Sequence, residues 1–158
     1  EEIIVSGDNM AGTFYKCFYK NLSALYIPTV DQHIKRCFLH NRLFQIFISA
    51  MAVTGAYYDV PMGEVQKPGK VRDTFIGLSE ESAALGRKLG IEFKEDIVEY
   101  NLKVIDKLAP ESTASMQKDI AKGHESEVQG LLFDMITAAE EQGIDIPTYR
   151  MVAEKFRS

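Results

Sequence analysis

The sequence predicts an all-α fold, a helical bundle of about five to seven helices, over most of the chain. Two observations predict it. Apolar residues recur at three- and four-residue steps from Arg72 to the C-terminus, and glycine or proline stands where each repeat must stop. A chain of 158 residues is long enough for one domain with a real core.

The first predicted helix covers residues 43–56, "LFQIFISAMAVTGA", in which apolar or small residues cover every face. Such a helix belongs in the middle of a bundle, and its alanines and Gly55 permit neighbouring helices to approach closely. It is shorter than the roughly 20 apolar residues of a membrane-spanning helix. Residues 1–43 stay unassigned, because "EEIIVSG" could begin a strand and "TFYKCFYKNLSALY" could form an aromatic helix.

The Pro/Gly-rich segment 61–70, "PMGEVQKPGK", predicts a loop. Three amphipathic repeats follow it. The first ends at Gly90, where a left-handed residue commonly closes a helix, the second ends at Ala109-Pro110, and the third ends at Gly143. A last short helix is expected after Pro147. The repeats are Phe75, Leu78, Ser82, Leu85 and Leu89; Ile97, Val98, Asn101, Val104, Ile105 and Leu108; and Val128, Leu131, Leu132, Met135, Ile136 and Ala139.

Composition and motifs argue against several function classes. A formal net charge of -5 with scattered basic residues disfavours nucleic acid and anionic membranes as partners. Cys17 and Cys37 form no metal motif, the histidines lack ligand spacing, and no metal site is predicted. Reduced thiols and the absence of a basic leader favour a cytoplasmic protein. The stretch 7–13, "GDNMAGT", has no phosphate-binding lysine, and no G-x-G-x-x-G occurs, so the sequence predicts no dinucleotide site.

The segment 112–127, "STASMQKDIAKGHESE", has two interpretations. In the structural one, Ser112 is a helix N-cap, Gly123 ends the helix, and Glu127 lies in the next first turn, where the helix dipole favours its ionised form. In the functional one, Ser115, Asp119 and Glu127 face one cleft at a helix-break-helix corner. Spacing alone leaves both interpretations open.

The same segment resembles the C-terminal helical domain of the ketopantoate reductases (2-dehydropantoate 2-reductases), a domain of the 6-phosphogluconate-dehydrogenase-like type. The resemblance covers roughly residues 44–157, and the N-terminal segment 1–43 falls outside it. It rests on "STASMQKDIAKGHESEVQGL", similar to the family's S-S-M-x-x-D block with its later T-E, on "AAEEQGIDIPTYRMV", and on "FISAMAVTGAYYDVPMGEV", similar to a family core helix that ends in P-[ILM]-G.

The resemblance implies a role for each residue of the corner. Ser115 matches the serine that binds the substrate carboxylate, and Asp119 matches a supporting aspartate. Glu127 matches the catalytic glutamate, which bonds the hydroxyl side of the substrate and assists a lysine. In this sequence Phe44 occupies the position of the family's lysine, and Ile48 and Ala52 occupy the positions of its two asparagines. Lys16, in Phe14-x-Lys16, is an alternative lysine that requires a long insertion; otherwise it is an exposed lysine on an aromatic helix.

The expected function is therefore that of a substrate-binding and dimerisation domain in an NADPH-dependent 2-keto acid reductase of the pantothenate pathway. The NADPH would be held by an N-terminal Rossmann domain outside this chain, so we expect the chain alone to bind no NADPH and to be inactive. A homodimer is expected, because the helix at 43–56 is apolar on all faces. The alternative is a non-enzymatic helical dimerisation or binding module that keeps the family fold, and the loss of lysine at Phe44 favours it.

Overall fold

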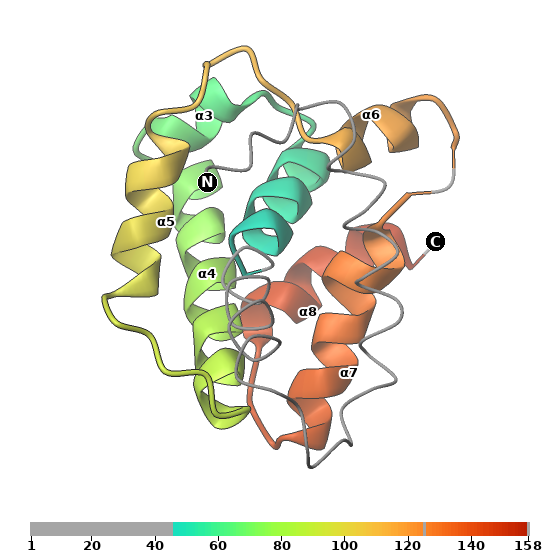
Figure 1. Cartoon of the computed structure of the whole chain (residues 1–158). Helices are drawn as coiled ribbons and strands as arrows, with labels where there is room; N and C mark the ends of the chain where they lie inside the picture. Colours follow the sequence, from blue (N-terminus) through green and yellow to red (C-terminus); the bar gives the residue numbers. More distant parts are fainter. Residues whose placement is uncertain (1–45, 125, 158) are drawn as a thin grey trace, which may run out of the picture. The chain divides into compact units, whose positions relative to one another are not determined.

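The computed structural model describes residues 46–124 and 126–157, which form helices joined by short loops, without a β-strand among them (Figure 1). The predicted all-α fold is confirmed for this part of the chain. The segment 1–43, with Lys16, and the family lysine position at Phe44 lie outside the described residues. No helix in the described ranges is long and apolar enough to cross a membrane.

The chain is helical from its first described residue, 46, to residue 58, and the remaining helices follow at short intervals. The bounds are α3 Met62–Gln66, α4 Lys70–Lys88, α5 Ile97–Ile105, α6 Ser115–Ala121, a π-helical turn Gln129–Phe133 that leads into α7 Asp134–Glu141, α8 Pro147–Ala153, and a 3₁₀ turn Glu154–Phe156.

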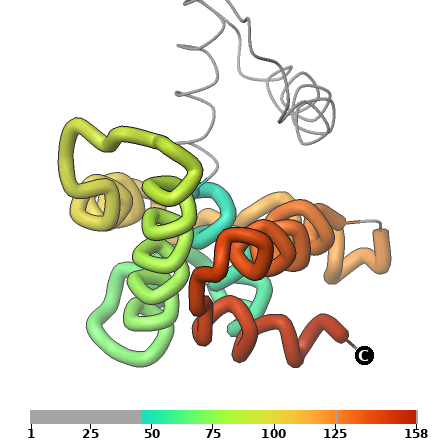
Figure 2. Tube along the Cα trace, turned by 90° about the horizontal axis from the view of Figure 1, so that it is seen from below, coloured from blue at the N-terminus to red at the C-terminus, as the bar shows by residue number. Residues whose placement is uncertain are grey.

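The helix at 46–58 is the central helix of the core, as predicted. Seen in two directions, α5, α4, this helix and α7 follow one another across the molecule (Figures 1 and 2). Ala50 and Val53 are fully buried. The ring of Phe47 packs edge to face against the ring of Phe75 on α4, with the two ring centroids 6.4 Å apart. Further members of the cluster come from α3, α4, the π-helical turn, α7 and α8; among them are Met62, Val65, Leu78, Leu85, Leu132, Ile136, Ala139, Tyr149 and Val152.

One predicted loop is wrong, because residues 62–66 of the segment 61–70 form α3. Pro61 precedes the helix, a position where its missing N–H costs nothing. The free N–H groups of Met62 and Gly63 donate to the carbonyls of Ser112 and Pro110, both at 2.8 Å. A distant loop thus supplies the acceptors that so short a helix lacks, and the sequence of 61–70 alone could not indicate them.

The predicted helix ends are largely confirmed. Gly90 has φ of +82°, and the N–H groups of Gly90 and Ile91 bond back to the carbonyls of Arg87 and Gly86. Pro147 is the first residue of α8. The second repeat ends earlier than expected, at Ile105 rather than Leu108, because Lys107 and Leu108 already make tighter i→i−3 bonds ahead of Pro110.

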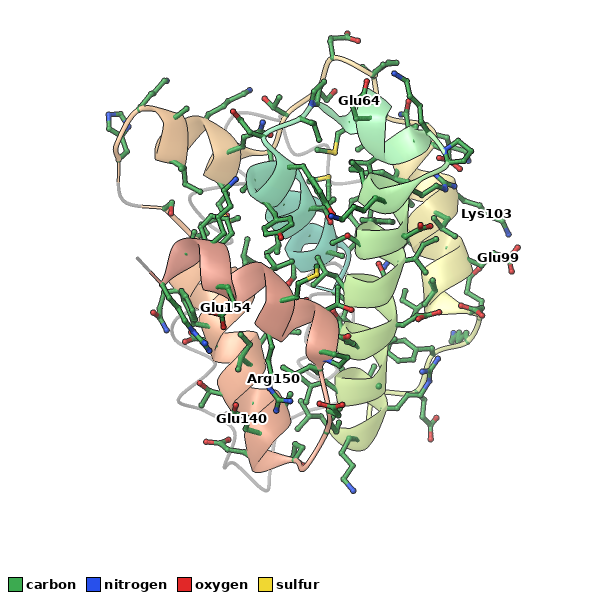
Figure 3. The ribbon with its side chains drawn as sticks, turned by 180° about the vertical axis from the view of Figure 1, so that it is seen from behind. Glu64, Glu99, Lys103, Glu140, Arg150 and Glu154 are labelled. Atoms are coloured by element: carbon green, nitrogen blue, oxygen red, sulfur yellow. The ribbon has the colours of Figure 1, made fainter. Side chains whose placement is uncertain are left out.

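Ion pairs on the surface join neighbouring helices. Arg72 of α4 holds Asp106, just after α5, through two bonds of 2.7 and 2.9 Å, and these bonds lower the pKa of Asp106. Figure 3 shows Arg150 of α8 with Glu140 of α7, whose charged atoms are 3.9 Å apart, and the pair Glu99–Lys103 along α5. Exposed pairs of this kind contribute little to stability.

Candidate functional site

The corner at 112–127 begins with α6, whose start differs from the structural interpretation. The residue before the helix is Ala114, no side chain caps it, and Ser112 is not the N-cap. The carbonyl of Ser112 instead accepts the N–H of Met62. Because this contact with α3 fixes the loop, the helix begins at Ser115, two residues later than an N-cap at Ser112 would place its start.

One face of α6 is anchored on the core, and this decides which face remains available. Met116 is fully buried and Gln117 nearly so. The amide nitrogen of Gln117 donates to the carboxylate of Asp59 at 2.9 Å. Gly55 on the central helix leaves room for this side chain, since a Cβ there would lie 3.2 Å from Oε1 of Gln117, which is a tight contact. Ser115 is consequently exposed and Asp119, one turn later on the same side, is half-buried.

Gly123 ends α6, as both interpretations expected. Its φ is +68°, a conformation in which a Cβ would be strained. The N–H of Gly123 donates to the backbone carbonyl of Ile120 at 3.0 Å, and the backbone N–H of His124 donates to the backbone carbonyl of Asp119 at 2.9 Å. This pair of bonds satisfies the last carbonyls of the helix and turns the chain toward Glu127.

The pKa of the Glu127 carboxyl is raised, first by burial and then by the charge of Asp119. The ionised form of Glu127, which the helix dipole was expected to favour, is therefore disfavoured overall. The carboxyl is partly removed from water and lies near a second carboxylate, and these two effects outweigh the weak field of one helix end. Asp119 is thus close enough to Glu127 for its charge to act on the Glu127 carboxyl.

The side chains of Ser115, Asp119 and Glu127 are not used as caps of the neighbouring helices. Neither α6 nor the π-helical turn after Val128 has a side-chain cap. Within residues 46–124 and 126–157, the side chains of Ser115, Asp119 and Glu127 make no hydrogen bond or ion pair. A carboxyl that holds its proton can donate a hydrogen bond while a neighbouring carboxylate accepts one, so the corner can offer both to a small polar ligand.

A buried hydroxyl cluster, which no sequence motif indicated as a site, contacts the π-helical turn that follows Val128. It consists of Ser49, Ser82 and Tyr149, and the Tyr149 oxygen is 2.6 Å from Ser49 Oγ and 2.7 Å from Ser82 Oγ. Burial raises the pKa of Tyr149 to about 12. The signal in the sequence was the placement of single serines within otherwise apolar helical faces.

The positions that the family resemblance assigns to asparagines lie in the apolar core. Ala52 is 2% exposed and belongs to the main hydrophobic cluster. Ile48 is partly buried and packs against the same cluster. Neither side chain can form a hydrogen bond, so neither of these two positions contributes a polar group to a site.

Comparison with known proteins gives the family and the fold. The model of the family described as "Ketopantoate reductase PanE/ApbA C terminal" matches residues 39–158. A search of curated protein sequences finds no match.

Solved structures share the fold at low identity. A ketopantoate reductase of the PanE/ApbA family from Ralstonia eutropha JMP134 is 23% identical, with TM-score 0.66 over 75% of this chain and 39% of its own. A dimeric ketopantoate reductase from Staphylococcus aureus is 16% identical, with TM-score 0.71 over 82% and 44%. A D-mandelate dehydrogenase complexed with NADH is 17% identical, with TM-score 0.62 over 72% and 44%. The chain therefore spans less than half the length of each.

Proposed function

We propose that this chain is the substrate-binding half of a reductase of small 2-keto acids. The chain belongs to the family of the ketopantoate reductase C-terminal domain, and this membership supports the proposal. The observation that carries the proposal is the pairing of Asp119 with Glu127, whose pKa is raised, beside the exposed Ser115. A site that reduces a carbonyl needs a proton donor near the carbonyl oxygen, and a carboxyl with a raised pKa can be that donor.

The roles follow from the chemistry of a 2-keto acid, which has a carboxylate next to a ketone. Ser115 donates its hydroxyl hydrogen to the substrate carboxylate. Glu127 donates to the ketone oxygen, which becomes the hydroxyl of the product, and Asp119 supports Glu127 by keeping its proton bound. Lys16 is the candidate second catalytic group, because the family position at Phe44 cannot donate a proton. NADPH would supply the hydride that reduces the carbonyl carbon.

We propose that the cofactor is held by a Rossmann domain outside this chain, as in a complete NADPH-dependent reductase in the cytoplasm. The chain alone is then expected to bind no NADPH. Titration of NADPH fluorescence tests this, and binding in the low micromolar range would contradict it. A homodimer is also part of the proposal, since the similar S. aureus reductase is dimeric. The central helix does not itself supply the interface, because residues 46–56 are mostly buried within the chain.

The second candidate function is a non-enzymatic helical module that retains the family fold. One observation favours it: Ile48 and Ala52 contribute to the core where the family resemblance places polar groups. The two functions differ in one measurable property. A non-enzymatic module has no reason to bind a 2-keto acid at the corner, whereas a reductase domain must do so.

The decisive experiment is an NMR titration of the isotope-labelled chain with ketopantoate. We expect shifts at Ser115, Asp119 and Glu127, and binding at least about tenfold weaker in Glu127→Ala, which removes the hydrogen-bond donor from this position. Glu141→Ala, at an exposed glutamate on α7, is the matched control and should bind like the wild type. Absence of shifts at millimolar ketopantoate, or equal binding by both variants, would overturn the proposed function.

A further inference from the structure

The π-helical turn Gln129–Phe133 separates Glu127 from the regular part of α7. A π-helical turn accommodates one residue more than an α-helical turn does. Since one residue corresponds to about 100° of rotation in an α-helix, the turn decides which side of the helix the preceding residues occupy. Leu132, Ile136 and Ala139 are fixed in the core, so conversion of the turn to α-helix would rotate Glu127 rather than α7.

The turn is held by a hydrogen bond from a different helix. Ser49, fully buried on the central helix, donates its hydroxyl hydrogen to the carbonyl of Leu131 at 2.7 Å, across 82 residues of sequence. Leu131 lies in the middle of the π-helical turn. A buried bond of this kind links the position of the turn to the central helix of the core.

The number of hydroxyl hydrogens in the cluster limits which of its contacts can be hydrogen bonds, and in which direction each hydroxyl donates. Ser49, Ser82 and Tyr149 have one hydroxyl hydrogen each, but they make four contacts: two with each other and one each with the carbonyls of Leu131 and Leu78. Only two arrangements place a hydrogen in both hydroxyl–hydroxyl contacts and also give each of the three hydrogens an acceptor. In one arrangement the last hydrogen is donated to the carbonyl of Leu131, and in the other it is donated to the carbonyl of Leu78.

The arrangement that ends at Leu131 is favoured. In it Ser82 donates to Tyr149, Tyr149 to Ser49, and Ser49 to the Leu131 carbonyl. The carbonyl of Leu78 lies inside the regular helix α4, where the backbone N–H four residues later serves it. The Leu78 carbonyl therefore keeps a hydrogen bond when the Ser82 hydroxyl donates to Tyr149 instead.

We propose that Ser49 is a positioning residue, whose bond to the Leu131 carbonyl maintains the π-helical turn and so keeps Glu127 on the side of the helix that faces Asp119. The proposal rests on the proposed function only in taking Glu127 as the group that matters. Tyr149 and Ser82 orient the Ser49 hydroxyl but are not required for its bond to Leu131.

The test is the titration of the Glu127 carboxyl by carbon NMR in Ser49→Ala, with Ser82→Ala as the matched control. Both variants remove one buried serine hydroxyl that contacts Tyr149. In Ser49→Ala we expect the pKa of Glu127 to fall by about half a unit or more, because the carboxyl moves away from Asp119 and into water. In Ser82→Ala it should stay at the wild-type value.

A crystal structure of Ser49→Ala supplies the second readout, and a regular α-helical turn in place of the π-helical turn is the expected result. An unchanged pKa of Glu127, or a retained π-helical turn, would overturn the proposal. Should Ser49→Ala fail to fold, Ser49→Cys, with a thiol of similar size and poorer donor strength, is measured in the same two ways. Neither readout needs a substrate, so this proposal can fail while ketopantoate binding stands, and the reverse.

Discussion

Glu81 on α4 caps the N-terminus of α8 and thereby fixes Tyr149: its carboxylate accepts the backbone N–H of Tyr149 at 3.0 Å and that of Thr148 at 2.7 Å. Helix α8 has no cap of its own, because Ile146 occupies the N-cap position. A carboxylate at the positive end of a helix stabilises it through both the hydrogen bonds and the dipole. The cap also fixes the backbone of the residue whose hydroxyl contacts Ser49 and Ser82.

Glu81→Ala is expected to lower the free energy of unfolding by about 1–2 kcal/mol, because two N–H groups lose their acceptor. Chemical denaturation measures it. Glu80→Ala, at the exposed neighbouring position, is the control and should change stability by less than about 0.5 kcal/mol. Equal effects of the two substitutions would show that the cap contributes nothing.

Glu127→Gln is expected to change how stability depends on pH. The pKa of Glu127 is raised above its ordinary 4.5 in the folded chain, so the folded state binds this proton more tightly than the unfolded state. Stability from this group is present below pH 4.5 and is lost as pH rises through the folded pKa. The variant should therefore be as stable as the wild type, or more so, at neutral pH.

The measurement is the difference in unfolding free energy between Glu127→Gln and wild type from pH 4 to 8, in which contributions from other groups cancel. This difference should move in favour of the variant as pH rises. A glutamate stabilised by the helix dipole would give the opposite slope, because its ionised form would be the favoured one.

Tyr149→Phe is expected to cost about 1 kcal/mol at neutral pH, because one buried hydroxyl is lost while Ser49 and Ser82 keep backbone acceptors. Its effect should shrink in alkali. The folded pKa of about 12 lies above the ordinary 10.0, so the stability linked to this proton is lost as pH rises above 10. Unfolding measured at pH 7 and pH 10.5 tests both statements, with Tyr100→Phe, an exposed tyrosine on α5, as the control.

Gly63→Ala is expected to destabilise the contact between α3 and the loop before α6. A Cβ at Gly63 would lie 2.9 Å from Cβ of Pro110 and 3.0 Å from its carbonyl oxygen, and the backbone there cannot move aside freely. Overpacking of this kind costs about 1–3 kcal/mol. Thermal unfolding should show the loss, whereas Glu64→Ala on the same helix should have little effect.

Much of the candidate site could be predicted from the sequence, because local rules decide it. Gly123 ends α6 since its backbone conformation suits glycine, and Ser115 and Asp119 share a side of α6 since they are four residues apart. The spacing between Asp119 and Glu127 around this glycine indicated that they belong to one corner. Their mutual repulsion and the resulting pKa of Glu127 could not be predicted, because desolvation depends on surrounding residues distant in sequence.

Local patterns alone predict that the chain is helical, where most helices end, and that residues 43–56 contain the buried central helix. Apolar spacing and the backbone preferences of glycine and proline act within a few residues, so they can be read locally. Contacts between distant parts of the folded chain establish that residues 62–66 form a helix, that Ser112 is not a cap, and that the Ser49 hydroxyl reaches the Leu131 carbonyl. Each of these depends on a hydrogen bond between residues about 50 or more apart in the sequence, and no local pattern specifies such a partner.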